Sequence, residues 1–212
     1  MVIAQCGSIW RLTAGSPYPW KWRWIDLGVD RCLFPRLKRS FAPQGQRRFC
    51  VINLYNAQEK GSDIVEALAK TRPGYRFTWI AGEDPGLPNI DYHRYLPNTD
   101  RNFQRMVARC DFILAPSRED AQAGVVIEAM SIGLIPAVSY TSGYSIGVPN
   151  VVLGDSVQEW LDVIDQLQSA PASDLISYRR ELDRYLACFH DWCVVEKQIC
   201  LYLREYLARF DL

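Results

Sequence analysis

The chain has 212 residues, 49% of them hydrophobic and 23% charged, and its formal net charge is zero. This composition is typical of a globular protein with one main domain, and no apolar run approaches the roughly 18 residues that cross a bilayer. Seven scattered cysteines without a C-x-x-C pair, and only two histidines, argue against a zinc site and favour buried free thiols in a reducing compartment. With no signal-peptide pattern after Met1, the sequence predicts a cytoplasmic protein.

The first 48 residues differ from the rest in charge and composition. Residues 1–49 carry nine Lys or Arg against two acids, and four of the seven tryptophans lie from Trp10 to Trp24. Weak hydrophobic periodicity predicts irregular structure with at most one strand. Interleaved basic and aromatic residues are compatible with a peripheral contact with an anionic membrane surface, here the inner face. Packing on a missing or partner domain is the simpler interpretation, and no nucleic-acid motif accompanies the charge.

From residue 49 onward, short apolar runs alternate with amphipathic stretches. The apolar runs predict strands at 49–54, 76–81, 90–95, 111–115, 135–139 and 151–153. Helical patterns lie between them at 61–71, 100–109 and 124–132, and a helical tail follows at 156–168, 174–188 and 191–210. Strands that alternate with helices predict an α/β fold with a parallel sheet covered by helices on both faces. Pro136 favours a strand start or a sheet edge for its run.

Three loops follow predicted strands, at 59–61, 116–120 and 140–143. Because the carboxyl ends of parallel strands meet at one edge, these loops should converge there. Lys60 lies just before a predicted helix, and Gly124 begins another. Helix N-termini offer free N–H groups and partial positive charge to a phosphate group, and a lysine adds a full charge. The pattern therefore predicts a phosphate-binding edge.

Asp120 and Glu128 lie eight positions apart around a segment of small residues. Carboxylates beside a phosphate site are unfavourable unless they accept hydrogen bonds, and sugar hydroxyls are suitable donors. We interpret the small residues as allowing the backbone to approach a diphosphate, while the two acids hold the sugars at either end. Simpler interpretations stay open, namely a solvated Lys60, a helix-capping Asp120 and ordinary turn glycines.

The order and spacing of four segments resemble the C-terminal, donor-binding domain of the group 1 glycosyltransferases, a retaining family of GT-B architecture. The segments are EKGSDI at 59–64, FTWIAG at 77–82, CDFILAPS at 110–117 and VIEAMSIGLIP at 126–136. The resemblance runs from about residue 28 to the end, where Phe189–Trp192 is similar to the opening of the family's last helix. It implies a Rossmann-like half of a GT-B fold with a helical C-terminal tail.

The resemblance also implies a role for each candidate residue. Lys60 would neutralise the departing diphosphate of the donor, Glu128 would bind the ribose hydroxyls, and Asp120 would contact the donor sugar, so these three form the catalytic set. Tyr95 and Leu96 would lie near the base. Beside the catalytic set, the implied substrate-binding positions are Gly61, Gly82, Tyr95, Leu96, Ser117, Arg118, Ala121, Gln122, Ala123, Gly124 and Val125.

The chain departs from the family pattern at several positions. The first acid is Asp120 instead of Glu, and the glycine-rich loop after the second strand is reduced to Gly82 and Glu83. Tyr55 occupies the position where the family has an arginine, five residues before the lysine, and Arg118 is the candidate to replace that phosphate contact. The family also has an acceptor-binding domain of comparable size ahead of the donor domain, and 48 residues cannot form one.

We therefore divide the chain into a basic, tryptophan-rich remnant or linker at 1–48 and a nucleotide-sugar-binding domain at 49–212. The predicted activity is sugar transfer from a nucleotide-diphosphate sugar to a glycan, a lipid-linked or another acceptor, as in polysaccharide biosynthesis, with this chain supplying the donor-binding half. For the acceptor domain three explanations stay open: the chain is a fragment, a partner chain supplies the other half, or the chain is a degenerate binder. Because no Asp-x-Asp triplet occurs, we expect neither a cofactor nor a catalytic metal. The alternatives are a non-catalytic nucleotide-sugar-binding subunit or fragment, and a nucleotide-sugar epimerase of the same architecture.

Overall fold

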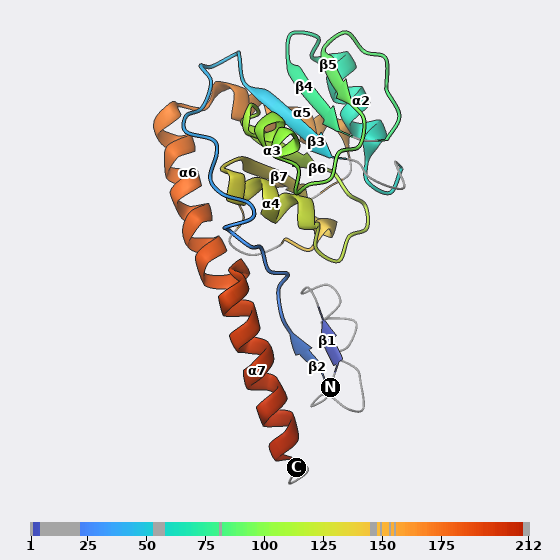
Figure 1. The fold of residues 1–212 in the computed structure, drawn as a ribbon. Helices are drawn as coiled ribbons and strands as arrows, with labels where there is room; N and C mark the ends of the chain where they lie inside the picture. The colour runs from blue at the N-terminus through green and yellow to red at the C-terminus, as the bar shows by residue number, and fades with distance from the viewer. Residues whose placement is uncertain are drawn as a thin grey trace.

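A parallel sheet of six strands forms the centre of the molecule, in the order β5-β4-β3-β6-β7-β8 (Figure 1). The structure is a computed structural model that describes residues 2–4, 22–52, 58–80, 82–144, 148, 150–152, 154 and 156–209, with backbone alone for 2–4 and 22–24. The strands are β3 (Arg48–Ile52), β4 (Arg76–Ile80), β5 (Ile90–His93), β6 (Phe112–Ala115), β7 (Ile135–Ser139) and β8 (Val151–Val152). Every neighbouring pair is parallel, as the sequence predicts.

Apolar side chains at matching register positions hold the central strands together. Phe49 pairs in register with Phe77 on one side and with Phe112 on the other. Their ring centroids lie 5.5 Å and 5.2 Å apart, and all three rings are buried. Pro136 lies near the start of β7, and β8 pairs only with Val138 and the residue after it, so the missing N–H of the proline interrupts no pairing with β8.

Helices cover both faces of the sheet. On one face α2 (Ser62–Thr71) contacts α5 (Val157–Ser169), and on the other α3 (Arg101–Ala108) contacts α4 (Gly124–Ile132). Right-handed crossovers explain this placement. Helix α2 connects β3 to β4, in the direction of the β5 edge, whereas α3 and α4 connect strands in the direction of the β8 edge. The predicted α/β fold, a Rossmann-like parallel sheet covered on both faces, is therefore confirmed.

The C-terminal tail is helical, as predicted. It consists of α6 (Ala172–Tyr185), a short π-helical turn, η3 (Leu186–His190), and α7 (Trp192–Ala208). Figure 1 shows that α7 extends away from the sheet, to the end of the molecule where both chain termini lie. Among the described residues of α7 only Val195 is buried, because the helix has little of the body beside it. None of the helices that the structure describes combines the length and apolar character that crossing a bilayer would require.

Residues before β3 form more regular structure than expected. The sequence predicts at most one strand there, whereas β1 (Val2–Ala4) and β2 (Trp22–Trp24) form a parallel pair. The pair lies at the same end of the molecule as the end of α7 (Figure 1). The predicted membrane contact through the Trp10–Trp24 segment rests on side chains outside the described residues, as does the departure at Tyr55.

The cysteines correct one prediction. Cys50 and Cys110 are buried free thiols, as expected. Four others are free but exposed, and three of these lie on η3 and α7, where the tail leaves the sheet; the four are Cys32, Cys188, Cys193 and Cys200. Burial of the thiols therefore holds only for those in the body of the molecule.

Backbone hydrogen bonds join the segment that leads into the sheet to the start of α7, and we call this contact the crossing clamp (Val29 with His190–Trp192). The N–H of Val29 donates to the carbonyl of His190 at 2.7 Å, and the N–H of Trp192 donates to the carbonyl of Val29 at 3.4 Å. A Cβ added to Gly28 would clash with the indole of Trp192. His190 is buried, and its Nδ1 lies 2.7 Å from the carbonyl of Leu27.

Candidate functional site

A cavity of about 230 Å³ lies at the carboxyl ends of β3 and β6, and we call it the carboxyl-end cavity. Apolar residues at the ends of the two strands form its floor. Six predicted site residues line the rest of it, and they are Lys60, Ser117, Asp120, Ala123, Gly124 and Val125. The cavity therefore lies where open parallel sheets bind their ligands, and the loop before α2 and the segment between β6 and α4 enclose it.

The three loops that the sequence predicts at this edge come together. The N–H of Arg118 donates to the carbonyl of Glu59 at 2.8 Å, which ties the segment after β6 to the loop before α2. The N–H of Asp120 donates to the carbonyl of Thr141 at 3.1 Å, which ties the same segment to the loop after β7. The segment after β6 is thus fixed on both sides by backbone hydrogen bonds.

Lys60 and Asp120 form an ion pair at the cavity. Lys60 Nζ lies 2.5 Å from Asp120 Oδ2, and 33% and 14% of the two side chains are exposed. In the unliganded protein the charge of the lysine is therefore balanced by the acid. An anion that enters the cavity meets an ammonium group already held in place, and it can displace the carboxylate of Asp120.

Two glycines allow the loops to approach so closely. Gly61 has a φ of 72° and Gly143 a φ of 81°, a region that side chains rarely tolerate. A Cβ at Gly61 would clash with the carbonyl of Pro116, and one at Gly143 would clash with the carbonyl of Ala121. The predicted site residue Gly61 therefore serves to place Lys60 against the segment after β6.

We expect Gly61→Ala to lower the free energy of unfolding by about 1–3 kcal/mol, because it adds both backbone strain and a clash with Pro116. Urea denaturation measures the loss. The matched control is Gly74→Ala, since an added Cβ there has no atom within 4 Å; this control should be neutral or stabilising by up to about 1 kcal/mol. Equal losses in the two variants would contradict the role assigned to the Pro116 contact.

Glu128 lies one turn after Gly124 on the same side of α4, but it does not line the carboxyl-end cavity. Its Oε1 accepts a hydrogen bond from Asn98 Nδ2 at 2.8 Å. Its Oε2 is buried and has no hydrogen-bond partner among the described residues. Burial raises the pKa of Glu128, and the bond from Asn98 opposes this shift. The carboxylate of Glu128 thus lies between α4 and the loop after β5.

Asn98 is a site candidate that sequence reasoning missed. It lies in the loop after β5, two residues beyond the predicted Leu96 and two before Asp100, whose side chain caps α3. The sequence could have indicated Asn98 only as a polar residue in a loop that follows a predicted strand. It does not indicate that Asn98 contacts Glu128, which lies 30 positions away.

Several predicted positions lie outside the cavity. Both guanidinium Nη atoms of Arg118 donate to Asp63, at 2.8 Å each, and this pairing lowers the pKa of Asp63. Gln122 is buried and bonds to the segment before β3. Its Oε1 accepts from the N–H of Leu27 at 2.5 Å, and its Nε2 donates to Asp26 Oδ1 at 2.9 Å. The structure therefore gives Arg118 and Gln122 partners within the protein, and a ligand would have to displace them.

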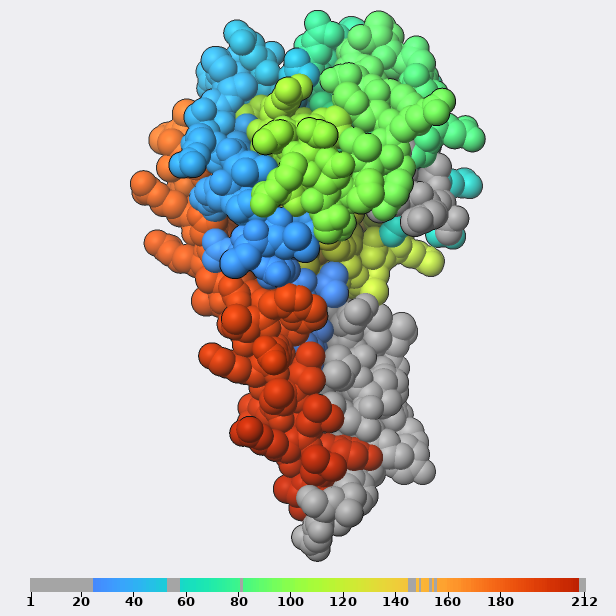
Figure 2. Space-filling model, in the orientation of Figure 1, coloured from blue at the N-terminus to red at the C-terminus, as the bar shows by residue number. Residues whose placement is uncertain are grey.

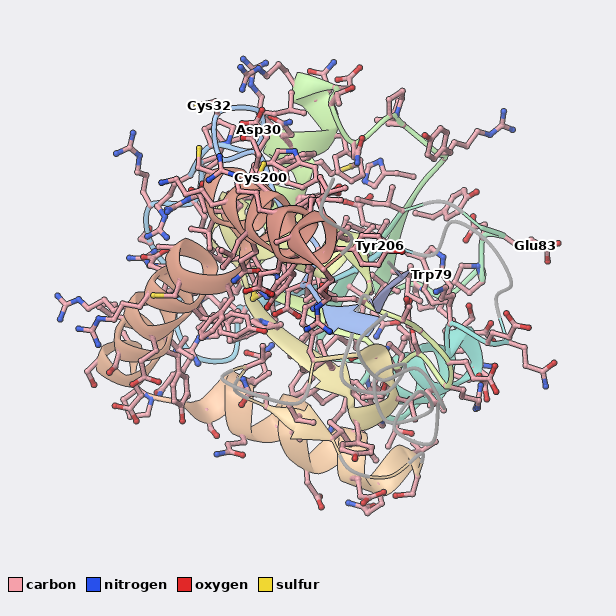
Figure 3. All side chains as sticks on the ribbon, turned by 90° about the horizontal axis from the view of Figure 1, so that it is seen from below. Asp30, Cys32, Trp79, Glu83, Cys200 and Tyr206 are labelled. Carbon is pink, nitrogen blue, oxygen red and sulfur yellow. The ribbon has the colours of Figure 1, made fainter. Side chains whose placement is uncertain are left out.

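The remaining positions lie toward β4 and β5. Tyr95 is 58% exposed, and Leu96 lines a different cavity beside α3. The carbonyl of Gly82 accepts a hydrogen bond from the Tyr92 hydroxyl at 2.8 Å, and Glu83 points outward at the rim of the molecule (Figure 3). In the part of the chain that the structure describes, no group of three or more His, Cys, Asp or Glu side chains could hold a metal ion.

No protein-family model matches the sequence, and no curated protein matches it. Solved structures do match. HepE of Anabaena, in complex with UDP and glucose, has a TM-score of 0.75 at 15% identity, covering 96% of this chain and 62% of that one. The sucrose-phosphate synthase of Thermosynechococcus elongatus has a TM-score of 0.68 at 16% identity, covering 89% and 53%.

WaaG, a glycosyltransferase involved in lipopolysaccharide biosynthesis, has a TM-score of 0.67 at 15% identity, covering 92% of this chain and 60% of that one. The chain therefore spans between 53% and 62% of the length of these three proteins. At such identities the likeness concerns the fold. The fold expected from the resemblance, one Rossmann-like half of the GT-B architecture, is thereby confirmed.

Proposed function

We propose that this chain is the donor-binding half of a retaining glycosyltransferase that uses a nucleotide-diphosphate sugar. The observation that carries the proposal is the carboxyl-end cavity, where the ammonium group of Lys60 and the start of α4 at Gly124 line one hollow. The shared fold supports it, because the HepE structure holds UDP and glucose on the same architecture. The acceptor would be a glycan or a lipid-linked molecule, as in polysaccharide biosynthesis.

The start of α4 is suited to a phosphate group. The N-cap residue is Ala123, and no side chain caps the helix. The N–H of Val126 donates to the carbonyl of Ala123 at 3.0 Å, so the N–H groups of Gly124 and Val125 are the ones that we propose for a ligand. Together with Lys60 they would stabilise the negative charge that develops on the diphosphate. We propose that they act without a metal ion, because they supply the positive charge that a divalent cation provides in other transferases.

Asp120 would change partner when the donor binds. As the diphosphate takes up Lys60, the carboxylate of Asp120 is released to accept a hydrogen bond from a hydroxyl of the donor sugar. In the reaction, the bond between the anomeric carbon and the diphosphate breaks, and its electron pair leaves with the diphosphate. The acceptor oxygen then bonds to the same carbon and passes its proton to an oxygen of the departing diphosphate. The transition state resembles an oxocarbenium ion, which a nearby carboxylate stabilises.

Glu128 would bind the ribose through its unpaired Oε2, while Asn98 keeps the carboxylate oriented through Oε1. Tyr95 and Leu96, in the same loop as Asn98, would then lie near the base. The backbone between Ala121 and Val125 would line the sugar and the diphosphate.

We expect Glu128→Gln to weaken nucleoside diphosphate binding by about tenfold, because a charged hydrogen-bond acceptor for the ribose is lost. The same change should stabilise the free protein at neutral pH. Burial raises the pKa of Glu128 above its ordinary value of 4.5, so the folded state holds the proton more tightly than the unfolded state. Ionisation of Glu128 therefore lowers the free energy of unfolding. This loss is absent below pH 4.5 and is complete above the raised pKa of the folded state.

Urea denaturation across this pH range measures the stability difference, and calorimetric titration with UDP or GDP measures the affinity. Glu66→Gln is the matched control, since Glu66 lies on α2 with 38% of its side chain exposed and pairs with Lys70. Glu128→Gln with unchanged affinity would remove Glu128 from the site, and a stability difference that is the same at acid and neutral pH would contradict its buried, ionised state.

A thermal-shift panel of nucleoside diphosphates and nucleotide sugars, with and without EDTA, tests the proposed function directly. We expect stabilisation by at least one nucleoside diphosphate and no effect of EDTA. Binding without transfer or hydrolysis would favour the non-catalytic subunit, and interconversion of a free nucleotide sugar without an acceptor would favour the epimerase. The absence of any nucleotide effect would contradict all three functions.

Acceptor recognition would lie outside this donor-binding domain. The length of the chain supports this division, since it spans 53% to 62% of the length of the three structures described above. The basic, tryptophan-rich segment at 1–48 would act as a remnant or linker beside the donor-binding domain at 49–212. We further propose a cytoplasmic location, with this segment in contact with the anionic inner face of a membrane.

A further inference from the structure

A second cavity, of about 400 Å³, lies between α3 and the strands β4 and β5, of which β5 forms the edge of the sheet. We call it the arginine cavity, because Arg48, Arg105 and Arg109 line it. It shares no lining residue with the carboxyl-end cavity. Arg48 is the first residue of β3, so the arginine cavity reaches the amino end of a strand whose carboxyl end borders the other cavity. Figure 2 shows the green surface of α3 on the face turned to the viewer.

Helix α3 presents one polar side to this cavity. Asn102, Arg105 and Met106 of α3 line the cavity together with the C-cap residue Arg109, and their spacing of three or four residues places them on one side of the helix. Arg105 and Arg109 are like charges at the spacing that destabilises a helix. Across the part of the chain that the structure describes, neither guanidinium group has a hydrogen bond or an ion pair, so no acid among these residues offsets the repulsion.

A single carboxylate faces the three arginines among the described residues that line the cavity. Asp91 Oδ2 lies 4.0 Å from Arg48 Nη1, and Asp91 Oδ1 lies 3.2 Å from His93 Nε2. The negative charge of Asp91 thus compensates that of Arg48, and the positive charges of Arg105 and Arg109 are not compensated by any other residue of the described lining. A concave site with an excess of two positive charges is matched by a dianion.

We propose that the arginine cavity binds the phosphate group of a phosphate monoester. A guanidinium group donates two parallel hydrogen bonds to phosphate oxygens, and Arg105 and Arg109 can approach the group from one side while Arg48 approaches from the strand. The volume falls within the range of about 300–1,000 Å³ typical of small-molecule sites and exceeds what a bare phosphate ion fills. A phosphorylated molecule of the size of a sugar fits this space.

Calorimetric titration of the full chain tests this site with three probes, namely inorganic phosphate, a hexose 6-phosphate and vesicles that contain phosphatidic acid. We expect the double variant Arg105→Gln/Arg109→Gln to lose at least about tenfold in affinity, because each arginine contributes charged hydrogen bonds. Binding should also weaken as salt is raised, since the arginines are open to solvent.

The control double variant is Arg101→Gln/Arg204→Gln, which removes the same charge. Arg101 lies on α3 outside the cavity lining, and Arg204 lies on α7. This control should bind phosphate as the parent chain does, and circular dichroism verifies that both double variants are folded. Tighter binding of the hexose phosphate than of the vesicles identifies a soluble ligand, and the reverse order identifies a lipid headgroup; both support a phosphate site.

Three results would overturn the proposal. The first is no binding of any probe, and the second is the same affinity in the two double variants. The third is binding that Lys60→Ala abolishes and Arg105→Gln/Arg109→Gln leaves intact, because the phosphate would then occupy the carboxyl-end cavity. The same variants separate the two sites, since loss of nucleotide binding in Lys60→Ala has no bearing on the arginine cavity.

Discussion

Replacing Lys60 by alanine is expected to weaken the binding of a nucleoside diphosphate at least tenfold and to leave the stability of the protein nearly unchanged. Lys60 carries the sole full positive charge in the described lining of the carboxyl-end cavity. A charge-assisted hydrogen bond to phosphate contributes about 1.5–3 kcal/mol, which corresponds to about tenfold or more in affinity. The variant also leaves the carboxylate of Asp120 unbalanced beside the ligand, and the two negative groups repel one another.

Calorimetric titration with UDP and GDP measures this effect. The stability should change by no more than about 1 kcal/mol, because the pair with Asp120 is partly exposed. Lys70→Ala is the control, since Lys70 lies on α2 and pairs with Glu66 at the surface. The additional change Asp120→Asn in the Lys60→Ala background should recover part of the affinity by removing the repulsion. Equal affinities of Lys60→Ala and the parent chain would refute the proposed phosphate site.

The largest effect on stability is expected for Asp111→Ala, with a loss of about 3–5 kcal/mol. Asp111 is fully buried just before β6. Its Oδ1 lies 2.9 Å from Lys38 Nζ and accepts from the N–H of Ala42 at 2.9 Å, and its Oδ2 accepts from the N–H of Arg48 at 2.9 Å. Removal of the carboxylate leaves Lys38, 6% exposed, as an uncompensated charge and two N–H groups without acceptors.

Urea or thermal denaturation measures this loss. Asp91→Ala serves as the control, because Asp91 is 58% exposed and its ion pairs are open to solvent, so the expected change is about 1 kcal/mol or less. A second substitution, Lys38→Met, in the Asp111→Ala background should recover part of the stability by removing the buried charge. The same small loss for Asp111→Ala and Asp91→Ala would contradict the structural role of the buried pair.

Most of the fold could be predicted from the sequence because its central strands, β3, β4, β6 and β7, are largely buried on both faces. Continuous apolar runs such as 111–115 and 135–139 correspond to β6 and β7, and the helical patterns between them are long enough to be distinguished by period. The prediction was weaker where burial is weaker. Among the first 24 residues, the described ones form two short strands in place of at most one, because the pairing of these strands depends on contacts that no local pattern encodes.

The candidate site also contains residues whose position could be predicted from the sequence and contacts that could not. Lys60, Asp120 and Gly124 could be placed together because the carboxyl ends of parallel strands meet at one edge, and this rule needs only the order of strands and helices. The partners of Arg118 and Glu128 could not be predicted. Arg118 pairs with Asp63 over 55 positions, and Glu128 bonds to Asn98 over 30, and such distances in sequence leave no periodic signal. The arginine cavity was missed for the same reason, since Arg48 and α3 meet only in three dimensions.

The crossing clamp has a mechanical consequence. The chain passes twice between the sheet and the end where both termini lie, once before β3 and once through η3 into α7 (Figure 1), and both passes are bonded to each other at Val29. Two segments that are hydrogen-bonded to each other at this position cannot slide past each other. Anything carried by the far end is therefore expected to turn about the crossing clamp, so that its orientation relative to the sheet changes while its distance from the sheet is kept.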